Sequence, residues 1–276
     1  MLMLRNSWIP PSKADARFFT VLTNLGLTTN LKLCLDSGDE ASYTSGQKFL
    51  DRSGGGYDFF FGADATAAAD DPTFNGVAGA VSSAEYMSFD GGDFFLYDTA
   101  NETWMQNIHK DGFTGGIAAW VYCPASGGLQ SGTYNGASAN IGFGFVVGTG
   151  DHGFRTAKAV GGGVYALLKS GDAFPNASAW NFAAVSINEN GGNVSFLYLN
   201  GAYNQVSAAN TFDAAYSSPS AAAATTTMGV GSNGGTTADK ASSGTRLGGY
   251  VVWEGTAPTK ANFDSFFATT RTRYGI

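Results

Sequence analysis

The stretch WNFAAVSINENGGNVSFLYLNGA, residues 180–202, is the part of the chain that decides its fold. Residues 180–187 form a largely apolar run of strand length, and residues 194–199 form a second one. Between them, Asn190-Gly191-Gly192 tolerates the positive φ angles of a tight reversal, and Asn200-Gly201 ends the second run with another turn dipeptide. A β-hairpin this apolar is not stable alone in water, so the sequence predicts a second layer packed against it.

The composition of the whole chain agrees with a fold built from short strands and tight turns. The 276 residues include 39 glycines, and aromatic residues make up 14% of the chain. Charged residues make up 13%, where roughly 25% is usual. Low charge combined with many aromatic residues argues against an intrinsically disordered chain. The length suits one large all-β domain with a substantial core.

The charge pattern argues against two classes of partner. The formal net charge is −7 and the sequence contains no basic cluster, so we expect no nucleic-acid partner. No stretch approaches the ~20 apolar residues that span a bilayer, so we expect no membrane partner. The N-terminal apolar run is too short for a signal peptide and a charged residue follows it at once, which predicts synthesis in the cytoplasm without a leader.

Helices are predicted only near the two ends of the chain. An extended arm that carries Trp8 precedes residues 12–25, which have the i, i+4, i+7 apolar spacing of a helix. Residues 258–273 predict a C-terminal helix with an apolar phenylalanine side. The apolar face of the first helix has two interpretations, packing on its own sheet or docking onto a partner. We therefore divide the chain into an N-terminal arm and helix, residues 1–30, as a candidate anchor, and a sandwich over residues 31–276.

Between these ends the sequence predicts at least ten short strands separated by turn signals, without an internal repeat. This pattern is typical of an antiparallel β-sandwich or barrel, because alternating strands and helices would be expected for a parallel sheet. The strands are expected at residues 31–36, 57–61, 84–89, 94–97, 115–123, 140–147, 163–168, 180–187, 194–199, 227–231 and 246–254.

Six blocks of sequence follow one another in a recognisable order. They are a leucine-rich strand followed by Asp, an Asp-x-Ser-Gly turn, a Phe-Asp-Gly turn, an aromatic strand, the hairpin quoted above, and a closing strand with a helix. The blocks are LKLCLDSGDEASY (31–43), FLDRSGGGYDFFFG (49–62), YMSFDGGDFFLYD (86–98), FTGGIAAWVY (113–122), WNFAAVSINENGGNVSFLYLNG (180–201) and RLGGYVVWEGTAPTKANFDSFFATTRTRYGI (246–276).

Together these blocks resemble the laminin-G-like, concanavalin A-like jelly-roll family over about residues 31–276. The resemblance implies an all-β fold, a two-sheet antiparallel jelly-roll sandwich with a concave face. The family spans lectins, adhesion modules and glucanases. The opening Trp8-Ile9-Pro10-Pro11, followed by the first block, looks most like the members that occur in phage particles.

Catalysis by this fold requires carboxylates in a pattern that the sequence lacks. Glucanases of the family carry Glu-x-Asp-x-x-Glu on one strand, and the alternation of side chains aims all three carboxylates into the cleft. None of the glutamates in this chain is followed by Asp two residues later. We therefore expect no enzyme, and a glycan hydrolase with an unfamiliar acid pair is the catalytic alternative. The glutamates are Glu40, Glu85, Glu102, Glu189 and Glu254.

The cysteines and histidines also give no catalytic or zinc-binding pattern. Cys34 and Cys123 lie in apolar, strand-like contexts, which favours two buried free thiols over a disulfide bond. His109 lies in a polar connection and His152 in a glycine-flanked loop, so we expect both to be solvated. A Ser-His-Asp triad and a zinc site are therefore disfavoured.

Calcium is the ion that the resemblance implies, because family members hold it at one rim through loop carboxylates and carbonyls. Asp90, Asp93 and Asp98 lie within one block and are the candidate ligands. The alternative is that these residues form turns, since Asp and Gly favour chain reversals. No other cofactor is expected.

Carbohydrate recognition combines exposed aromatic rings with amide or acidic hydrogen-bonding groups. Aromatic residues in loop-like contexts beside asparagines are therefore the candidate ligand-binding residues, and ordinary packing at the rim is the alternative. The tryptophans inside predicted strands are instead expected in the core, and they are Trp120, Trp180 and Trp253. The candidate ligand-binding set is Trp104, Asn101, Tyr134, Asn135 and Tyr203.

The resulting hypothesis is a non-enzymatic phage virion protein with a structural or adhesive role, as a capsid decoration, head-fibre or tail-fibre component. Its expected partners are other virion proteins, contacted through the N-terminal arm, and host surface polysaccharide, and its expected location is the virion. Glycine-rich sandwiches with few charges also self-associate, so a homo-oligomer fits the sequence. The alternative is a stand-alone lectin-like domain that binds carbohydrate outside a virion.

Overall fold

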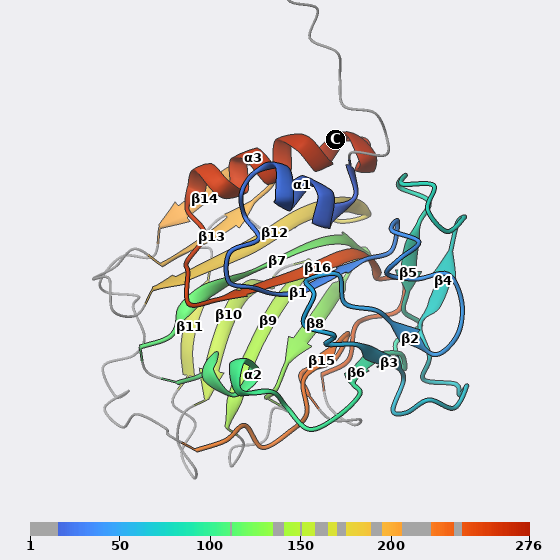
Figure 1. Ribbon diagram of the computed structural model, residues 1–276, viewed down its shortest axis with the longest axis horizontal. Coiled ribbons are helices and arrows are strands. Elements are labelled where there is room, and N and C mark those ends of the chain that lie inside the picture. The colour runs from blue at the N-terminus through green and yellow to red at the C-terminus, as the bar shows by residue number, and fades with distance from the viewer. Residues whose placement is uncertain are drawn as a thin grey trace, which may run out of the picture.

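The fold is a sandwich of two antiparallel β-sheets with helices against the outer face of one sheet (Figure 1). This computed structural model describes residues 16–110, 112–134, 141–149, 151–157, 165–169, 175–188, 195–205, 222–234 and 239–276. Within this described part each sheet has eight strands, and every pairing between named strands is antiparallel. The all-β, two-sheet sandwich expected from the sequence is confirmed.

Sheet A contains both strands of the hairpin with which the sequence analysis began. Its order is β14-β13-β12-β7-β16-β5-β4, and β1 and β5 pair with successive parts of the same edge of β16. The hairpin strands β12 and β13 pair in register, and β12 pairs with β7 along its whole length. The strands of sheet A are β1 (Leu31–Asp36), β4 (Thr73–Asn75), β5 (Tyr86–Ser88), β7 (Thr114–Cys123), β12 (Ala179–Asn188), β13 (Phe196–Leu199), β14 (Ala202–Gln205) and β16 (Arg246–Glu254).

Sheet B forms the opposite layer, in the order β11-β10-β9-β8-β15-β6-β3-β2. Three of its members, β2, β8 and β10, fall where the sequence analysis predicts no strand. β8 is rich in glycine and β10 is mostly polar, so neither shows a clear apolar alternation, and pairing on both sides makes them strands. The strands of sheet B are β2 (Lys48–Phe49), β3 (Phe59–Phe61), β6 (Phe95–Tyr97), β8 (Gly127–Gly132), β9 (Gly142–Thr149), β10 (Asp151–Ala157), β11 (Tyr165–Lys169) and β15 (Gly229–Val230).

The main core lies between the sheets, where inward-facing side chains from both layers interdigitate. Sheet B contributes mainly phenylalanines and sheet A mainly aliphatic residues. Cys34 and Cys123 are free and buried, as predicted. Representative core residues, each 0% exposed, are Phe49, Phe59, Phe95, Phe143, Phe145, Leu33, Leu35, Ile117, Val185 and Val252.

A second apolar cluster lies on the outer face of sheet A, beneath α1 (Phe18–Asn24) and α3 (Lys260–Thr270). In α1 the buried side chains are Phe18, Val21 and Leu22, so of the two interpretations of the first helix the structure shows packing on its own sheet. The helix is shorter than the predicted 12–25, and residues 1–15 lie outside the described residues. The expectation that the three strand tryptophans are buried is confirmed, and these are Trp120, Trp180 and Trp253.

The predicted C-terminal helix is confirmed as α3, followed by the 3₁₀ helix η4 (Arg271–Tyr274). A capping box starts α3, since the Thr259 side chain accepts from the Asn262 backbone N–H and the Asn262 side chain accepts in return. A third helix, α2 (Thr103–Asn107), joins the two sheets at the bottom of Figure 1. Among the described residues no helix is long and apolar enough to cross a bilayer.

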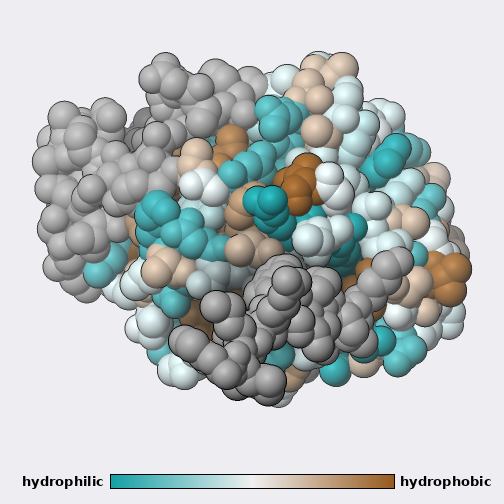
Figure 2. Space-filling model, turned by 90° about the horizontal axis from the view of Figure 1, so that it is seen from above, coloured by the Kyte–Doolittle hydropathy of each residue, from teal (hydrophilic) through white to brown (hydrophobic). Residues whose placement is uncertain are grey.

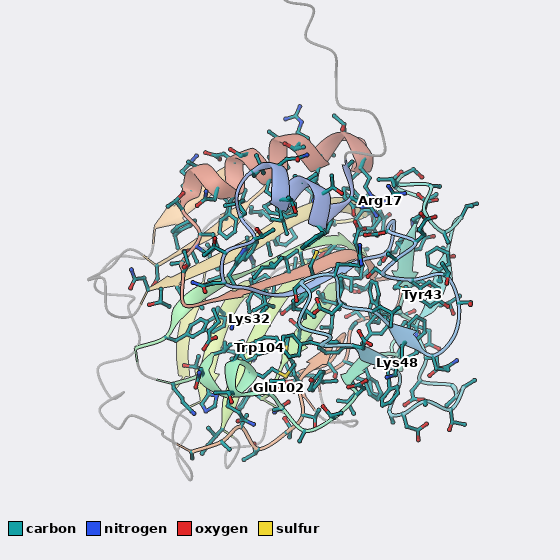
Figure 3. All side chains as sticks on the ribbon, viewed as in Figure 1. Arg17, Lys32, Tyr43, Lys48, Glu102 and Trp104 are labelled. Atoms are coloured by element: carbon teal, nitrogen blue, oxygen red, sulfur yellow. The ribbon has the colours of Figure 1, made fainter. Side chains whose placement is uncertain are left out.

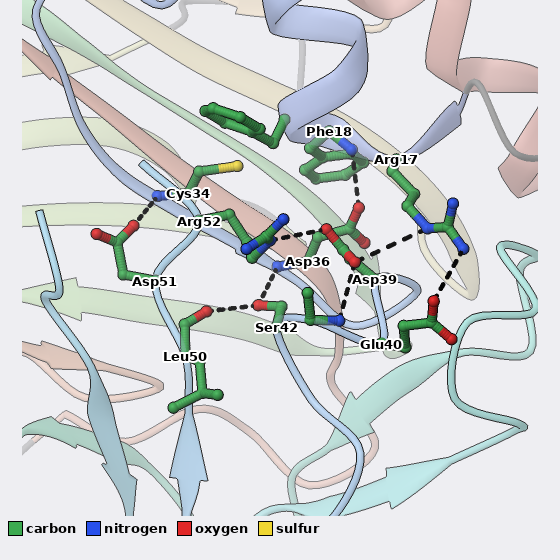
Figure 4. A network of polar contacts seen from close by, with 12 residues as sticks. Arg17, Phe18, Cys34, Asp36, Asp39, Glu40, Ser42, Leu50, Asp51 and Arg52 are labelled. Carbon is green, nitrogen blue, oxygen red and sulfur yellow. Dashed lines mark hydrogen bonds and ion pairs between the residues drawn. The ribbon is translucent and has the colours of Figure 1, made fainter. Parts of the chain in front are cut away.

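Asp36, at the end of β1, ties both terminal segments to sheet A. Its Oδ2 accepts a hydrogen bond from the backbone N–H of Phe18 at 2.8 Å (Figure 4), and its Oδ1 accepts from Nη1 of Arg273 at 2.7 Å. Both charged side chains are fully buried. A buried pair is tolerated when further hydrogen bonds accompany it. Asp36 accepts three, whereas Nη2 of Arg273 is buried without a hydrogen-bond partner among the described residues.

Candidate functional site

A pocket lies between the segment that follows α2 and the end of β16. Its volume is about 400 Å³, within the range of roughly 300–1,000 Å³ found for small-ligand sites. In Figure 1 this region is on the side where α2 sits below the ends of β7 and β16. The described residues that line it are Asn107, Lys110, Gly112, Phe113, Thr114, Glu254 and Gly255.

Glu254 is the centre of the polar lining. Its Oε1 accepts a hydrogen bond from Nδ2 of Asn107 at 2.8 Å, and its Oε2 lies 3.4 Å from Nζ of Lys32. Nζ of Lys110 in turn donates to Oδ1 of Asn107 at 3.3 Å. The four side chains form a connected network that holds the carboxylate in one orientation, with ammonium groups at both ends.

The backbone explains how segments far apart in sequence meet here. Glu254 is the last residue of β16, and Gly255 turns the chain away from the sheet with φ of +90°. The N–H of Gly255 donates to the carbonyl of Thr114 at 2.7 Å, which fixes the end of β16 beside the start of β7. Phe113 also lines the pocket, but its ring is 5% exposed and belongs to the core between the sheets.

This arrangement suits binding of a polyhydroxylated ligand. A carboxylate and an amide accept hydrogen bonds from hydroxyl groups, while ammonium and amide N–H groups donate to them. Glycoside hydrolysis uses a pair of carboxyl groups, and Glu254 is the only carboxylate among the described residues that line the pocket. The sequence analysis noted Glu254 only as a glutamate outside the glucanase motif. Asn107 and Lys110 lie in a connection that the sequence analysis did not single out as a binding segment.

The expectation that Trp104 and Tyr134 are exposed platforms is wrong. Trp104 lies on α2 (Figure 3) and is 3% exposed, and Tyr134 is 2% exposed. α2 turns Trp104 and Met105 into the core between the sheets, where the indole packs 5.5 Å from the ring of Tyr57. A buried ring offers no face for stacking on a sugar.

The rest of the predicted ligand-binding set does not gather around these rings. Asn101 bridges two backbone groups, since its Nδ2 donates to the Thr226 carbonyl at 2.8 Å and its Oδ1 accepts from the Met228 N–H at 2.7 Å. It therefore holds the segment that leads into β15. Asn135 lies outside the described residues, as does the side chain of Tyr203, whose backbone belongs to β14.

The three candidate calcium ligands are not brought together. Asp98 forms an ion pair with Lys48 at 2.6 Å. Asp93 accepts from the Asp90 N–H at 2.8 Å, and the two close the turn at the end of the Phe-Asp-Gly block. Burial and the neighbouring Asp90 carboxylate raise the pKa of Asp93 to about 7. No group of three or more His, Cys, Asp or Glu side chains within the described residues could hold a metal ion. The contacts of Asp90 and Asp93 with the backbone N–H groups of Gly92 and Asp90 are those of turn residues.

The expectation that both histidines are solvated is also wrong. His109 is 0% exposed, and its Nε2 lies 3.0 Å from the Ala222 carbonyl. His152 is 1% exposed on β10, with its ring 6.2 Å from that of Phe145. Burial lowers the pKa of His152 to about 4, so the ring is neutral at pH 7. The glycine-flanked sequence around His152 suggested a loop. In the structure His152 instead belongs to β10, which pairs with β9 and β11.

Comparison with known proteins identifies structural relatives only. No protein-family model and no curated protein sequence matches the chain. The botulinum neurotoxin serotype D binding domain has a TM-score of 0.54 and 11% identity, over 87% of this chain and 52% of that one. The binding domain of botulinum neurotoxin DC in complex with SialylT has a TM-score of 0.56 and 7% identity, over 88% and 52%.

An enzyme also shares this fold. Trypanosoma rangeli sialidase in complex with sialic acid has a TM-score of 0.51 and 11% identity, over 89% of this chain and 34% of that one. The chain therefore spans about half or less of the length of these solved structures. At such identities the likeness shows the fold, a lectin-like β-sandwich.

Proposed function

We propose that this protein is a glycan-binding adhesion module and that the pocket around Glu254 is its binding site. The observation that carries the proposal is the Glu254 carboxylate, which Asn107 and Lys32 hold in place, with Lys110 bound to the other end of the Asn107 amide. Small-ligand sites use a few fixed polar groups to orient the ligand. Sugar hydroxyl groups both donate and accept hydrogen bonds, so they match a lining that combines a carboxylate, an amide and ammonium groups.

The relatives support the same class of ligand. One of the neurotoxin binding domains was solved with SialylT. Cell entry of botulinum neurotoxin type C is dependent upon interaction with two ganglioside molecules, and the type C structure matches this chain with a TM-score of 0.52 at 10% identity, over 90% of this chain and 53% of that one. The proposal for this chain is non-enzymatic, because the described residues that line the pocket combine one carboxylate with a lysine rather than a second acid.

We further propose that the module acts as part of a phage virion. The resemblance of the opening Trp8-Ile9-Pro10-Pro11 and the first sequence block to family members that occur in phage particles supports a virion structural or adhesion role. Attachment is proposed through residues 1–15, because α1 itself is packed on sheet A. Deleting only residues 1–15 is expected to leave a folded module that is absent from purified particles, and normal incorporation would contradict this part.

Binding at the pocket is tested with a glycan array followed by isothermal titration calorimetry on the best ligand. Glu254→Gln and Asn107→Ala each remove a charge-assisted hydrogen bond, worth about 1.5–3 kcal/mol, so each is expected to weaken binding about tenfold or more. Glu40→Gln is the matched control, because the Glu40 side chain is 64% exposed and lies at another surface. Absence of glycan binding, or binding that neither pocket variant alters, would refute the proposal.

A further inference from the structure

A guanidinium group lies between two tyrosine rings on the outer face of sheet A. The guanidinium carbon of Arg246 is 4.4 Å from the ring centroid of Tyr122 and 4.8 Å from that of Tyr86. The three residues belong to adjacent strands, since β16 pairs with both β7 and β5 and Arg246 lies directly opposite Tyr122. All three side chains are partly exposed.

Trp180 extends this cluster along the same row of the sheet. It pairs with Tyr122 across β12 and β7, and its ring lies 5.9 Å from Tyr122 and 6.1 Å from Tyr86, close to perpendicular to both. Behind it, Tyr274 from η4 packs against the indole at 4.7 Å. Tyr274 therefore supports the aromatic cluster of Tyr86, Tyr122 and Trp180 from the protein side.

The charge of Arg246 has no counter-ion within the part of the chain that the structure describes. No hydrogen bond or ion pair joins its guanidinium to another described residue, and its nitrogens are not buried. The Tyr86 and Tyr122 hydroxyls likewise make no hydrogen bond to a described residue. The nearby Arg273 is already paired with Asp36. A solvent-facing cation with two free hydroxyls is a donor set for an anion.

Figure 2 looks onto the helix-covered side of the molecule, and outside the grey areas it shows hydrophilic and neutral patches mixed with small separate apolar ones. At Arg246 the cation and the two tyrosine rings match a ligand that combines an anionic group with a small apolar face. A planar carboxylate accepts two parallel N–H bonds from a guanidinium, and a pyranose ring offers C–H groups to an aromatic ring.

We propose that Arg246, Tyr86 and Tyr122 form a second binding site, specific for a carboxylated saccharide such as a uronate unit of an acidic polysaccharide. Arg246 holds the carboxylate, the partly exposed rings of Tyr86 and Tyr122 contact the sugar ring, and Trp180, which is 8% exposed, packs against both tyrosines. The site is distinct from the pocket, because Arg246 and Glu254 lie at opposite ends of β16, about 26 Å apart at roughly 3.3 Å per residue.

The test uses tri-galacturonate and its methyl ester as probes, measured by calorimetry with the full chain. The acid is expected to bind and the ester to bind at least about tenfold more weakly, because esterification removes the anion and leaves the ring. Arg246→Gln is expected to reduce acid binding by the same factor, and Tyr86→Leu to weaken it as well. Both residues are partly exposed, so unchanged circular dichroism and melting temperature serve as the folding check.

Glu254→Gln separates the two proposed sites. It is expected to leave binding of tri-galacturonate unchanged while reducing binding of a pocket ligand, so the failure of one proposal is distinguishable from the failure of the other. Equal affinity for acid and ester, full binding by Arg246→Gln, or no binding of the acid by the unaltered protein would overturn the second site. The stack of Arg246 on the two tyrosines would then be surface packing alone.

Discussion

Replacing Asp36 with Asn tests whether one buried charge ties the terminal helices to the sandwich. The native carboxylate accepts from Nη1 of Arg273 at 2.7 Å and from two backbone N–H groups, those of Phe18 at 2.8 Å and Gly38 at 2.9 Å. An amide of the same size presents one oxygen and one NH₂ group to these three donors. At least one donor therefore faces another donor, and the buried guanidinium loses its counter-ion.

The magnitude follows from the burial of the pair. Both side chains are 0% exposed, so water cannot replace the lost interaction, and removing one partner of a buried pair costs about 3–5 kcal/mol. At roughly 2–4 °C per kcal/mol for a domain near this size, Asp36→Asn is expected to lower Tm by about 6–20 °C. The exposed Lys260–Asp264 pair has side chains 45% and 42% exposed, and Lys260→Ala is expected to cost about 0.5 kcal/mol or less.

The assay is guanidinium chloride unfolding followed by tryptophan fluorescence, with calorimetric scans at pH 7. A drop in the midpoint at unchanged m-value would place the loss in native stability rather than in the unfolded state. Arg273→Met gives an independent approach from the other partner and is also expected to destabilise the protein. If Asp36→Asn stays within about 1 kcal/mol of the unaltered protein, no different from Lys260→Ala, the reasoning from the buried pair is wrong.

Three further predictions concern buried titratable groups. Because the folded pKa of Asp93 is raised to about 7, the folded state retains a proton that the unfolded state loses above pH 4, so this group's contribution to stability falls as pH rises from about 4 to 7. Asp93→Asn should remove this loss of unfolding free energy between pH 4 and 7, measured by urea unfolding at several pH values. An unchanged pH profile would count against the raised pKa of Asp93 beside Asp90. His152 has its folded pKa lowered to about 4, so its contribution is lost as pH falls from about 6.5 to 4, and His152→Leu should flatten the stability profile in that window. Burial raises the pKa of Cys34 well above its ordinary value and that of Cys123 to about 12, so both thiols should react with Ellman's reagent only after unfolding, and rapid labelling of the native protein would contradict this.

Much of the architecture was predictable from local sequence. Alternating apolar residues, turn dipeptides and a capped apolar helix gave the hairpin, most of the strands and α3, because these features depend on neighbours within a few residues. Five strands were missed. β2, β4 and β14 are only two to four residues long, and β8 and β10 carry little apolar alternation of their own. Hydrogen bonds to flanking strands make β8 and β10 part of sheet B.

The candidate sites were much less predictable. Trp104 looked like a loop residue, yet α2 turns it into the core. Conversely, Trp180 and Tyr122 were assigned to strands without any indication that the row also contains a partly exposed Arg246. Sequence pattern identifies which residues share a face of a strand. It does not identify which part of that face a helix from another region of the chain will cover.

The sequence by itself therefore determined the sandwich class and most of its strands, since those strands and their turns are encoded by their own residues. Only the tertiary structure decided which polar groups meet. It brings Asn107 and Lys110 from a connection to Glu254 at the end of β16, and it pairs Asp36 near one end of the chain with Arg273 near the other. Such contacts arise from long-range strand pairing and helix packing, so no local pattern of residues predicts them.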